Sequence, residues 1–115
     1  MTIDIQEEGT SIILKIAGDV DLFSSKELKE KLMEIFEGAF VGIVLDMEEV
    51  SYLDSMGVGC LLFAFSESKK KHKSIFFSSI IGMPRKVIQL TKLDNYFPLV
   101  ESIDVALTRL GKADE

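Results

Sequence analysis

Residue types that carry much of protein chemistry are scarce in this 115-residue chain, which has one cysteine, one histidine and no tryptophan. Cys60 has no second cysteine for an internal disulfide, and this agrees with a reducing compartment. A lone Cys60 and a lone His72 cannot supply a thiolate or imidazole cage for a metal ion. Because no apolar run reaches about 18 residues and residues 1–7 lack the basic start and apolar stretch of a signal peptide, we expect a soluble cytoplasmic protein.

Basic residues are also in the minority, with 13 Lys and Arg against 19 Asp and Glu, a net charge of -6. Nucleic acid is bound by clustered Lys and Arg, so this balance argues against nucleic acid as the main partner. The one basic cluster, Lys69–Lys73, stands where a helix is expected to end, which is where cations are favoured. The length fits one domain over residues 1–115, and 47% hydrophobic residues are typical of a chain that folds alone.

Hydrophobic periodicity and turn residues predict a single α/β domain. Strands are expected over 2–8, 11–17, 41–47, 74–80 and 97–100, and helices over 25–37 and 55–71, from Pro84 to the break at Asp94-Asn95, and after Ser102. The first two strands form an antiparallel hairpin with Ile3, Ile5, Ile12, Leu14 and Ile16 as the inward residues. The expected architecture is a mixed, mostly parallel sheet of about four to five strands, flanked by about four helices.

The first helix carries two signals of its start. Ser24 with Glu27 three residues later is the pattern of a capping box, and Phe23 with Leu28 is spaced as a hydrophobic staple.

The segment Tyr52–Gly59 is the most informative part of the chain, because it places Ser55 where a buried strand turns into a helix. Free backbone amides and the positive end of the helix dipole suit an anion there, so phosphate on Ser55 would cost the fold little. Asp54 and Ser55 are also good N-cap residues, so a purely structural capping pair is the alternative from the residues alone.

Other chemistry is weakly supported. The aspartates near strand ends suggest a magnesium site, but no His or Asn completes a ligand set, and we expect no metal; these residues are Asp19, Asp21, Asp46 and Asp54. A serine hydrolase is disfavoured because the Gly-x-Ser-x-Gly turn is missing and His72 is not placed as a base. Gly57 and Gly59 do not form a phosphate loop, and we expect them to allow close approach of a neighbouring backbone or of a partner's loop.

Two turns carry a resemblance to a known family. A strand pair ending in Gly18-Asp19-Val20-Asp21, then a capped helix, then a strand followed by Asp54-Ser55-Met56-Gly57 and a second helix, resembles the STAS domain of bacterial anti-sigma factor antagonists. The resemblance spans nearly the whole chain. It implies partner switching: the unphosphorylated antagonist binds an anti-sigma factor serine kinase and releases the sigma factor, and the kinase uses its own ATP to phosphorylate the antagonist.

The resemblance also assigns residues. Ser55 aligns with the phosphoacceptor, Asp54 precedes it as in the family, and Asp21 aligns with the family's acidic position near the acceptor hydroxyl. Met56 departs from the family, whose best-known members often carry a small polar residue after the acceptor.

The helix after Ser55 is expected to present a second apolar stripe, Met56, Cys60 and Phe63, to a partner. With this stripe, the expected kinase- or partner-binding residues are Asp19, Asp21, Asp54, Gly57 and Gly59. The domain itself is then a binding protein without a cofactor, not an enzyme, and a monomer is favoured. Two alternatives stay open: a STAS scaffold of another signalling or transport complex, and a nucleotide-binding protein that uses the acidic turn and the helix start.

Overall fold

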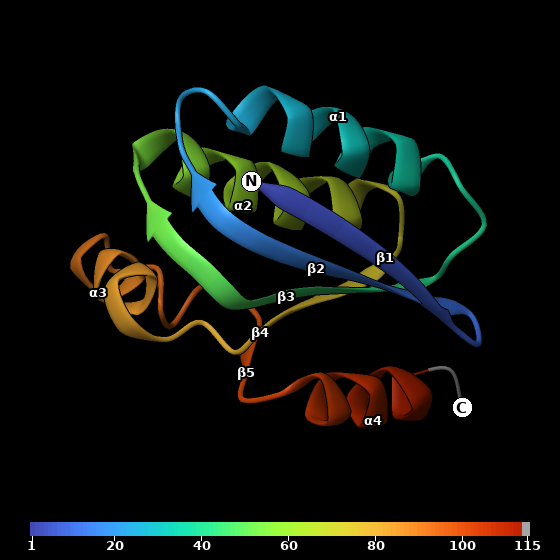
Figure 1. The fold of residues 1–115 in the computed structure, drawn as a ribbon. Helices are drawn as coiled ribbons and strands as arrows, with labels where there is room; N and C mark the ends of the chain where they lie inside the picture. The colour runs from blue at the N-terminus through green and yellow to red at the C-terminus, as the bar shows by residue number, and fades with distance from the viewer. Residues whose placement is uncertain (114–115) are drawn as a thin grey trace.

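The computed structural model describes residues 1–113 as alternating strands and helices. The elements are β1 (Thr2–Glu8), β2 (Ser11–Val20), α1 (Ser25–Phe36), β3 (Gly42–Leu53), α2 (Ser55–Lys70), β4 (Ser74–Ser78), α3 (Gly82–Leu90), β5 (Leu99–Val100) and α4 (Ile103–Ala113). Figure 1 shows their arrangement. In this part of the chain no helix is long and apolar enough to cross a membrane.

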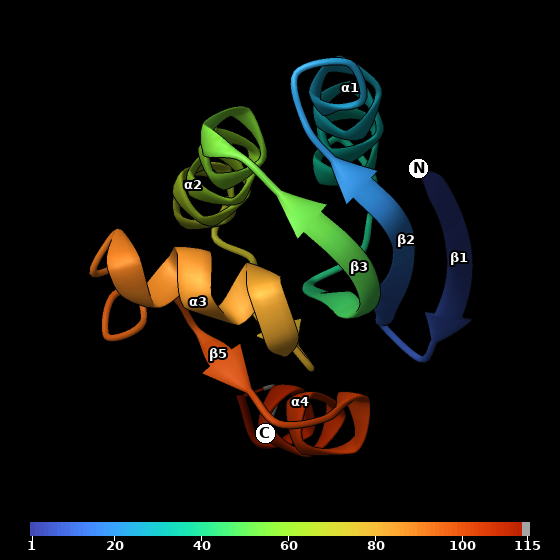
Figure 2. The same ribbon diagram turned by 60° about the vertical axis from the view of Figure 1, so that its left-hand side comes forward.

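The strands form one five-stranded sheet in the order β1-β2-β3-β4-β5. β1 pairs antiparallel with β2, and every later pairing is parallel. This confirms the predicted mixed sheet with an N-terminal hairpin and four helices. Helices α1 and α2 cover one face of the sheet and α4 covers the other, as Figures 1 and 2 show.

Both faces of the central strands are buried, which is why β2 and β3 read as nearly continuous apolar runs. In β2, Leu14 and Ile16 belong to the larger core beneath α1 and α2, whereas Ile13 belongs to a smaller core with Ala106 and Leu110 of α4. The inward assignment of Ile12, Leu14 and Ile16 is therefore confirmed. Ile5 is exposed, because β1 is an edge strand that the helices do not cover.

The strand β3 is longer than predicted, reaching Leu53 instead of Met47. Its pairing with β4 stops at Asp46, but its pairing with β2 continues to Leu53 through two register shifts. The acidic pair Glu48-Glu49, which directly follows the predicted strand, is exposed within the observed one. This extension carries the chain directly into Asp54 and Ser55.

Three elements in the C-terminal half also differ from the prediction in their bounds. β4 ends at Ser78, two residues early, because Ser79 adopts a left-handed φ of 58°. α3 begins two residues before Pro84 and ends at Leu90, before the expected break at Asp94-Asn95. The edge strand is reduced to Leu99–Val100, while the Ser102 cap is confirmed by the Val105 amide, which donates to Ser102 Oγ over 3.2 Å.

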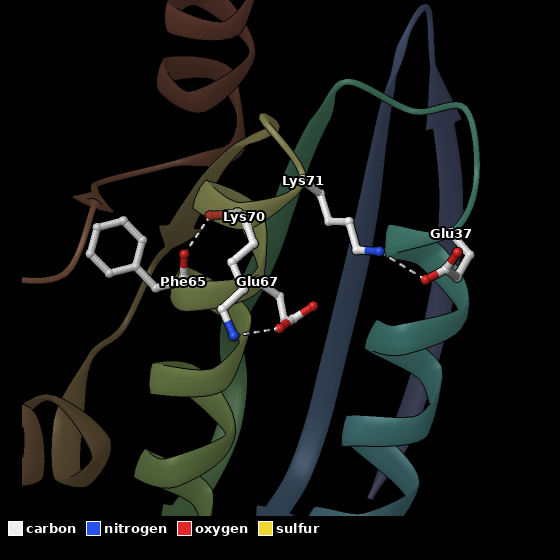
Figure 3. A network of polar contacts seen from close by, with 6 residues as sticks. Glu37, Phe65, Glu67, Lys70 and Lys71 are labelled. Atoms are coloured by element: carbon white, nitrogen blue, oxygen red, sulfur yellow. Dashed lines mark hydrogen bonds and ion pairs between the residues drawn. The ribbon is translucent and has the colours of Figure 1, made fainter.

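The ends of α1 and α2 far from Ser55 are tied together by polar contacts. Lys71 Nζ lies 3.1 Å from Glu37 Oε1, and Lys73 Nζ donates to the carbonyls of Gly38 and Phe40 at 2.6 Å each. Figure 3 shows the Lys71–Glu37 pair joining the two helices. Two lysines of the basic cluster, Lys71 and Lys73, thus bind groups at the end of α1 and in the loop that follows it.

Candidate functional site

The start of α2 is fixed by Asp54. This residue has an extended backbone and occupies the N-cap, where its Oδ1 accepts a hydrogen bond from the Gly57 amide over 3.0 Å. Its Oδ2 accepts from the amide of Leu22 over 3.1 Å. One carboxylate therefore satisfies a free amide of α2 and joins that helix to the loop between β2 and α1. The purely structural reading of Asp54 as an N-cap is correct, whatever else the residue does.

Gly57 allows α2 to begin this close to β2. A Cβ placed on Gly57 would stand 2.3 Å from the Val20 carbonyl oxygen and 2.5 Å from Leu53 Cδ1. No side chain fits there, so the predicted close approach of a neighbouring backbone is confirmed for Gly57. Gly59 is different, because a Cβ there would meet nothing within 4 Å.

Asp21 stabilises the loop between β2 and α1, the loop to which Asp54 is also hydrogen-bonded. Its Oδ1 accepts from the amides of Phe23 and Ser24 at 3.0 and 3.1 Å. Desolvation raises the pKa of Asp21, but the hydrogen bonds from Ser24 and Phe23, helped by the N-terminal ammonium, outweigh it and leave this pKa below its ordinary 3.8. No hydrogen bond joins Asp21 to Ser55, so in this structure its carboxylate serves the loop.

Helix α1 begins at Ser25 as predicted, but the two contacts predicted for its start are wrong. Ser24 stands at the N-cap, but its side chain makes no cap hydrogen bond; its Oγ instead accepts from the Asp21 amide over 2.9 Å. The capping box with Glu27 is therefore not formed. Phe23 is 89% exposed while Leu28 is fully buried, so they make no hydrophobic staple. The loop held by Asp21 turns Phe23 out to solvent.

Ser55 is the first residue of α2 and is exposed. Within residues 1–113 its hydroxyl makes no hydrogen bond. It lies on a groove of about 380 Å³ between α1 and α2; the lining residues are Ser25, Lys26, Lys29, Ser55, Met56, Gly59, Cys60 and Phe63. Lys26 and Lys29 were not among the predicted site residues, because their place beside Ser55 depends on how α1 packs against α2.

The second stripe of α2 is mostly used inside the protein. The Cys60 thiol is 5% exposed and donates to the Ser25 carbonyl oxygen of α1 over 3.3 Å. Burial raises the pKa of this thiol, with Lys29 opposing and Asp54 adding to the rise. Phe63 is half-buried and carries Lys29 Nζ 4.8 Å from its ring centroid. Met56, at 48%, is the freely exposed member of the stripe.

The side chain of Asp19 is not bonded to Asp21 or Asp54, although its backbone carbonyl accepts a hydrogen bond from Ser24 Oγ over 2.8 Å. Its Oδ1 accepts from Ser51 Oγ on β3 over 3.1 Å, and no contact links it to Ser55. Nor do the aspartates converge: within residues 1–113 no three His, Cys, Asp or Glu side chains are grouped so that they could hold a metal ion. Asp46 is buried and accepts from Ser78 Oγ over 3.1 Å.

Fold and site together define a small α/β domain with an exposed serine at a strand-to-helix turn. Residues 2–106 match the family model of the STAS domain, and the chain therefore belongs to the STAS domain family. The anti-sigma-B factor antagonist of Bacillus subtilis is 31% identical over 94 residues, 81% of this chain and 84% of the relative. The anti-sigma-F factor antagonist RsfB of Mycobacterium tuberculosis is 28% identical over 118 residues, 99% of this chain and 94% of the relative.

Solved structures show the same fold. An anti-sigma factor antagonist from Mycobacterium paratuberculosis superposes with a TM-score of 0.85 at 23% identity, covering 95% of this chain and 92% of that one. The anti-sigma factor antagonist SpoIIAA in its unphosphorylated form gives a TM-score of 0.82 at 21% identity, covering 96% and 97%. The phosphorylated form of SpoIIAA, from Bacillus, gives 0.73 at 22% identity, covering 94% and 98%.

Proposed function

We propose that this protein is an anti-sigma factor antagonist whose binding is gated at Ser55. Unphosphorylated, it binds an anti-sigma factor serine kinase and so releases the sigma factor; phosphorylated, it does not bind. ATP is held by the kinase, and this domain works by binding, as a cytoplasmic monomer, without catalysis or a cofactor of its own. The observation that carries the proposal is the Ser55 hydroxyl, exposed and without a hydrogen bond at a rigid helix start.

The surroundings of Ser55 suit a protein partner. We call Leu22, Phe23, Ser55 and Met56 the switch surface; Leu22 is 60% exposed, and its amide is bonded to Asp54, the residue before Ser55. Large apolar side chains left in water beside a polar group are typical of a contact surface. Asp21, Asp54 and Gly57 hold this surface in shape, whereas Gly59, Cys60 and Phe63 line the adjoining groove. Asp19, bonded to Ser51, would meet only the margin of a partner.

Phosphate on Ser55 changes this surface without refolding the domain. It adds about 1.5 to 2 negative charges among side chains that a partner would cover, next to the carboxylate of Asp54. Lys26 and Lys29 on the same groove would offset part of this charge. Covering the rest with a partner that brings no cation of its own costs several kcal/mol of binding free energy, enough to weaken a micromolar complex strongly. One feature supports a change confined to the surface: the Ser55 hydroxyl has no internal hydrogen bond to lose. The similar protein SpoIIAA has been solved in an unphosphorylated and a phosphorylated form, which supports phosphate as the signal.

The first test is intact-mass analysis after incubation with ATP and the anti-sigma factor kinases of the host. We expect a gain of one phosphate that is absent in Ser55→Ala. Ser66→Ala is the matched control, because Ser66 is an exposed serine farther along the same helix and its loss should leave the gain unchanged. If no kinase adds phosphate, a constitutive STAS scaffold becomes the better reading.

The second test measures affinity for the same kinases by calorimetry. Ser55→Ala should bind like the unphosphorylated protein, and Ser55→Glu should bind at least about tenfold more weakly. Phe23→Ser should weaken binding by at least about tenfold without lowering the melting temperature, because the ring packs against nothing in the free protein. Equal affinities for Ser55→Ala and Ser55→Glu would contradict gating at Ser55.

A further inference from the structure

A second site is suggested by a cavity at the opposite side of the sheet from β1. The cavity has a volume of about 860 Å³ and lies where β4 and β5 end; it is lined by residues 79–82 after β4, by Leu99–Glu101 at β5, and by side chains of α3 and α4. Its volume is within the range of small-molecule sites, about 300 to 1,000 Å³. The groove beside Ser55 shares no residue with it.

The cavity results from the path of the chain. After β4 the chain enters α3, whose Ile88 packs in the larger core with α1 and α2. After β5 it enters α4, whose Ala106 and Leu110 pack on the other face of the sheet. Figure 2 shows α3 and α4 on either side of β5. In open α/β sheets, ligands bind outside the carboxyl ends of the strands. The cavity lies at the carboxyl ends of β4 and β5, between two helices that pack on opposite faces of the sheet.

The charge at this cavity is unusual for an acidic protein. The chain has only two arginines, Arg85 on α3 and Arg109 on α4, and both line the cavity. Among the described residues neither guanidinium lies within 4.0 Å of a carboxylate, whereas four lysines make such ion pairs. Arg109 stands 5.9 Å from the ring centroid of Phe76, on the sheet. A guanidinium offers a planar fork of donors that matches phosphate oxygens, and among the described residues neither arginine has a carboxylate to occupy those donors.

The remaining lining divides into an apolar floor and one acid. Ile80, Leu99 and Val105 supply apolar contact area. Glu101 is exposed, and its backbone carbonyl accepts from Ser79 Oγ over 3.1 Å, which ties the ends of β4 and β5 together. Its carboxylate would repel an anion, so replacing Glu101 by a neutral residue tests whether the ligand is negatively charged.

We propose that this cavity binds a small phosphorylated organic molecule, with its phosphate at Arg85 and Arg109 and its apolar part on Ile80, Leu99 and Val105. The site is separate from Ser55 and does not depend on the function proposed above. Binding requires no movement of the backbone, because the hydrogen bond from Ser79 Oγ to the Glu101 carbonyl already joins the ends of β4 and β5.

The test is a titration of the full chain with phenyl phosphate at millimolar concentrations, followed by amide chemical shifts in ¹H–¹⁵N NMR spectra. Phenol is the control that lacks the phosphate. We expect saturable shifts at residues 79–85 and 99–109 with phenyl phosphate and none with phenol. Absence of saturable shifts there, or equal shifts with phenol, would overturn the proposal.

Substitutions of the charged residues that line the cavity test where the phosphate binds. Arg85→Gln and Arg109→Gln should each weaken binding about fivefold, and Glu101→Gln should strengthen it about twofold, as expected for partly exposed charges. Lys86→Gln is the matched control, because Lys86 follows Arg85 on the same helix, is exposed and does not line the cavity. Melting temperatures check that each variant is folded. Equal affinities for the arginine variants and Lys86→Gln would also refute the proposal.

Discussion

Replacing Gly57 by alanine tests whether the helix start beside Ser55 is as tightly packed as the structure shows. The new Cβ would meet the Val20 carbonyl oxygen at 2.3 Å, a backbone atom that cannot rotate away. The N-terminal turn of α2 must then move off β2, which also stretches the hydrogen bond from the Gly57 amide to Asp54. Gly59→Ala is the matched control in the same helix, because its Cβ would enter open space.

The expected free-energy changes have opposite signs. Alanine is favoured over glycine inside a helix by about 1 kcal/mol, which Gly59→Ala should gain. Gly57→Ala should gain at most the same amount but lose about 1 to 3 kcal/mol to overpacking and about 1 kcal/mol to the weakened cap. We therefore expect Gly57→Ala to be about 2 to 4 kcal/mol less stable than Gly59→Ala, which is roughly 8 to 16 °C in melting temperature for a domain of this size.

Urea unfolding of both variants beside the unmodified protein measures this difference. A Gly57→Ala variant as stable as Gly59→Ala would refute the argument, because it would show that α2 does not need a glycine to approach β2. If Gly57→Ala is destabilised as expected, it should also bind the kinase more weakly than the unmodified protein, since Ser55 moves with the first turn.

Two other residues of the site give separate predictions. Asp54→Ala should lower the free energy of unfolding by about 1 to 2 kcal/mol in urea, because the amides of Gly57 and Leu22 both lose their acceptor; no loss would show that water replaces the carboxylate fully. The pKa of Asp21, followed by NMR, should lie below 3.8. A carboxyl whose pKa is lower in the folded than in the unfolded protein stabilises the fold fully at pH values above its unfolded pKa. That stabilisation is lost as the pH falls through the pKa of the folded protein. A pH titration of unfolding should show this loss in the parent but not in Asp21→Asn, and a measured pKa at or above 3.8 would contradict the loop geometry.

The secondary structure was largely predictable because the sequence patterns were long and consistent. The hairpin, α1, α2 and the parallel crossover all follow from periodicity and from Gly, Pro and Asx signals. The errors fall where tertiary contacts override a local signal. β3 continues past Glu48 and Glu49 because it pairs with β2 as far as Leu53. The residue pattern of one strand does not show how far the neighbouring strand extends.

The start of α1 shows the same limit on a smaller scale. Ser24 and Glu27 match a capping box in the sequence, but the Asp21 carboxylate accepts the hydrogen bonds of the Phe23 and Ser24 amides instead. Asp54 then binds Leu22 from a position 32 residues farther along the chain. These contacts expose Phe23, which the local spacing had assigned to a buried staple.

The fold class, the strand-to-helix turn at Ser55 and the acid that caps it can be predicted from local residue patterns, because each depends on neighbouring residues and on backbone geometry. Which faces of α2 remain free depends instead on tertiary packing. Packing of α1 buries Cys60 and brings Lys26 and Lys29 beside Ser55. The cavity with both arginines likewise exists only because α3 and α4 leave the sheet on opposite faces, a choice that no local pattern encodes.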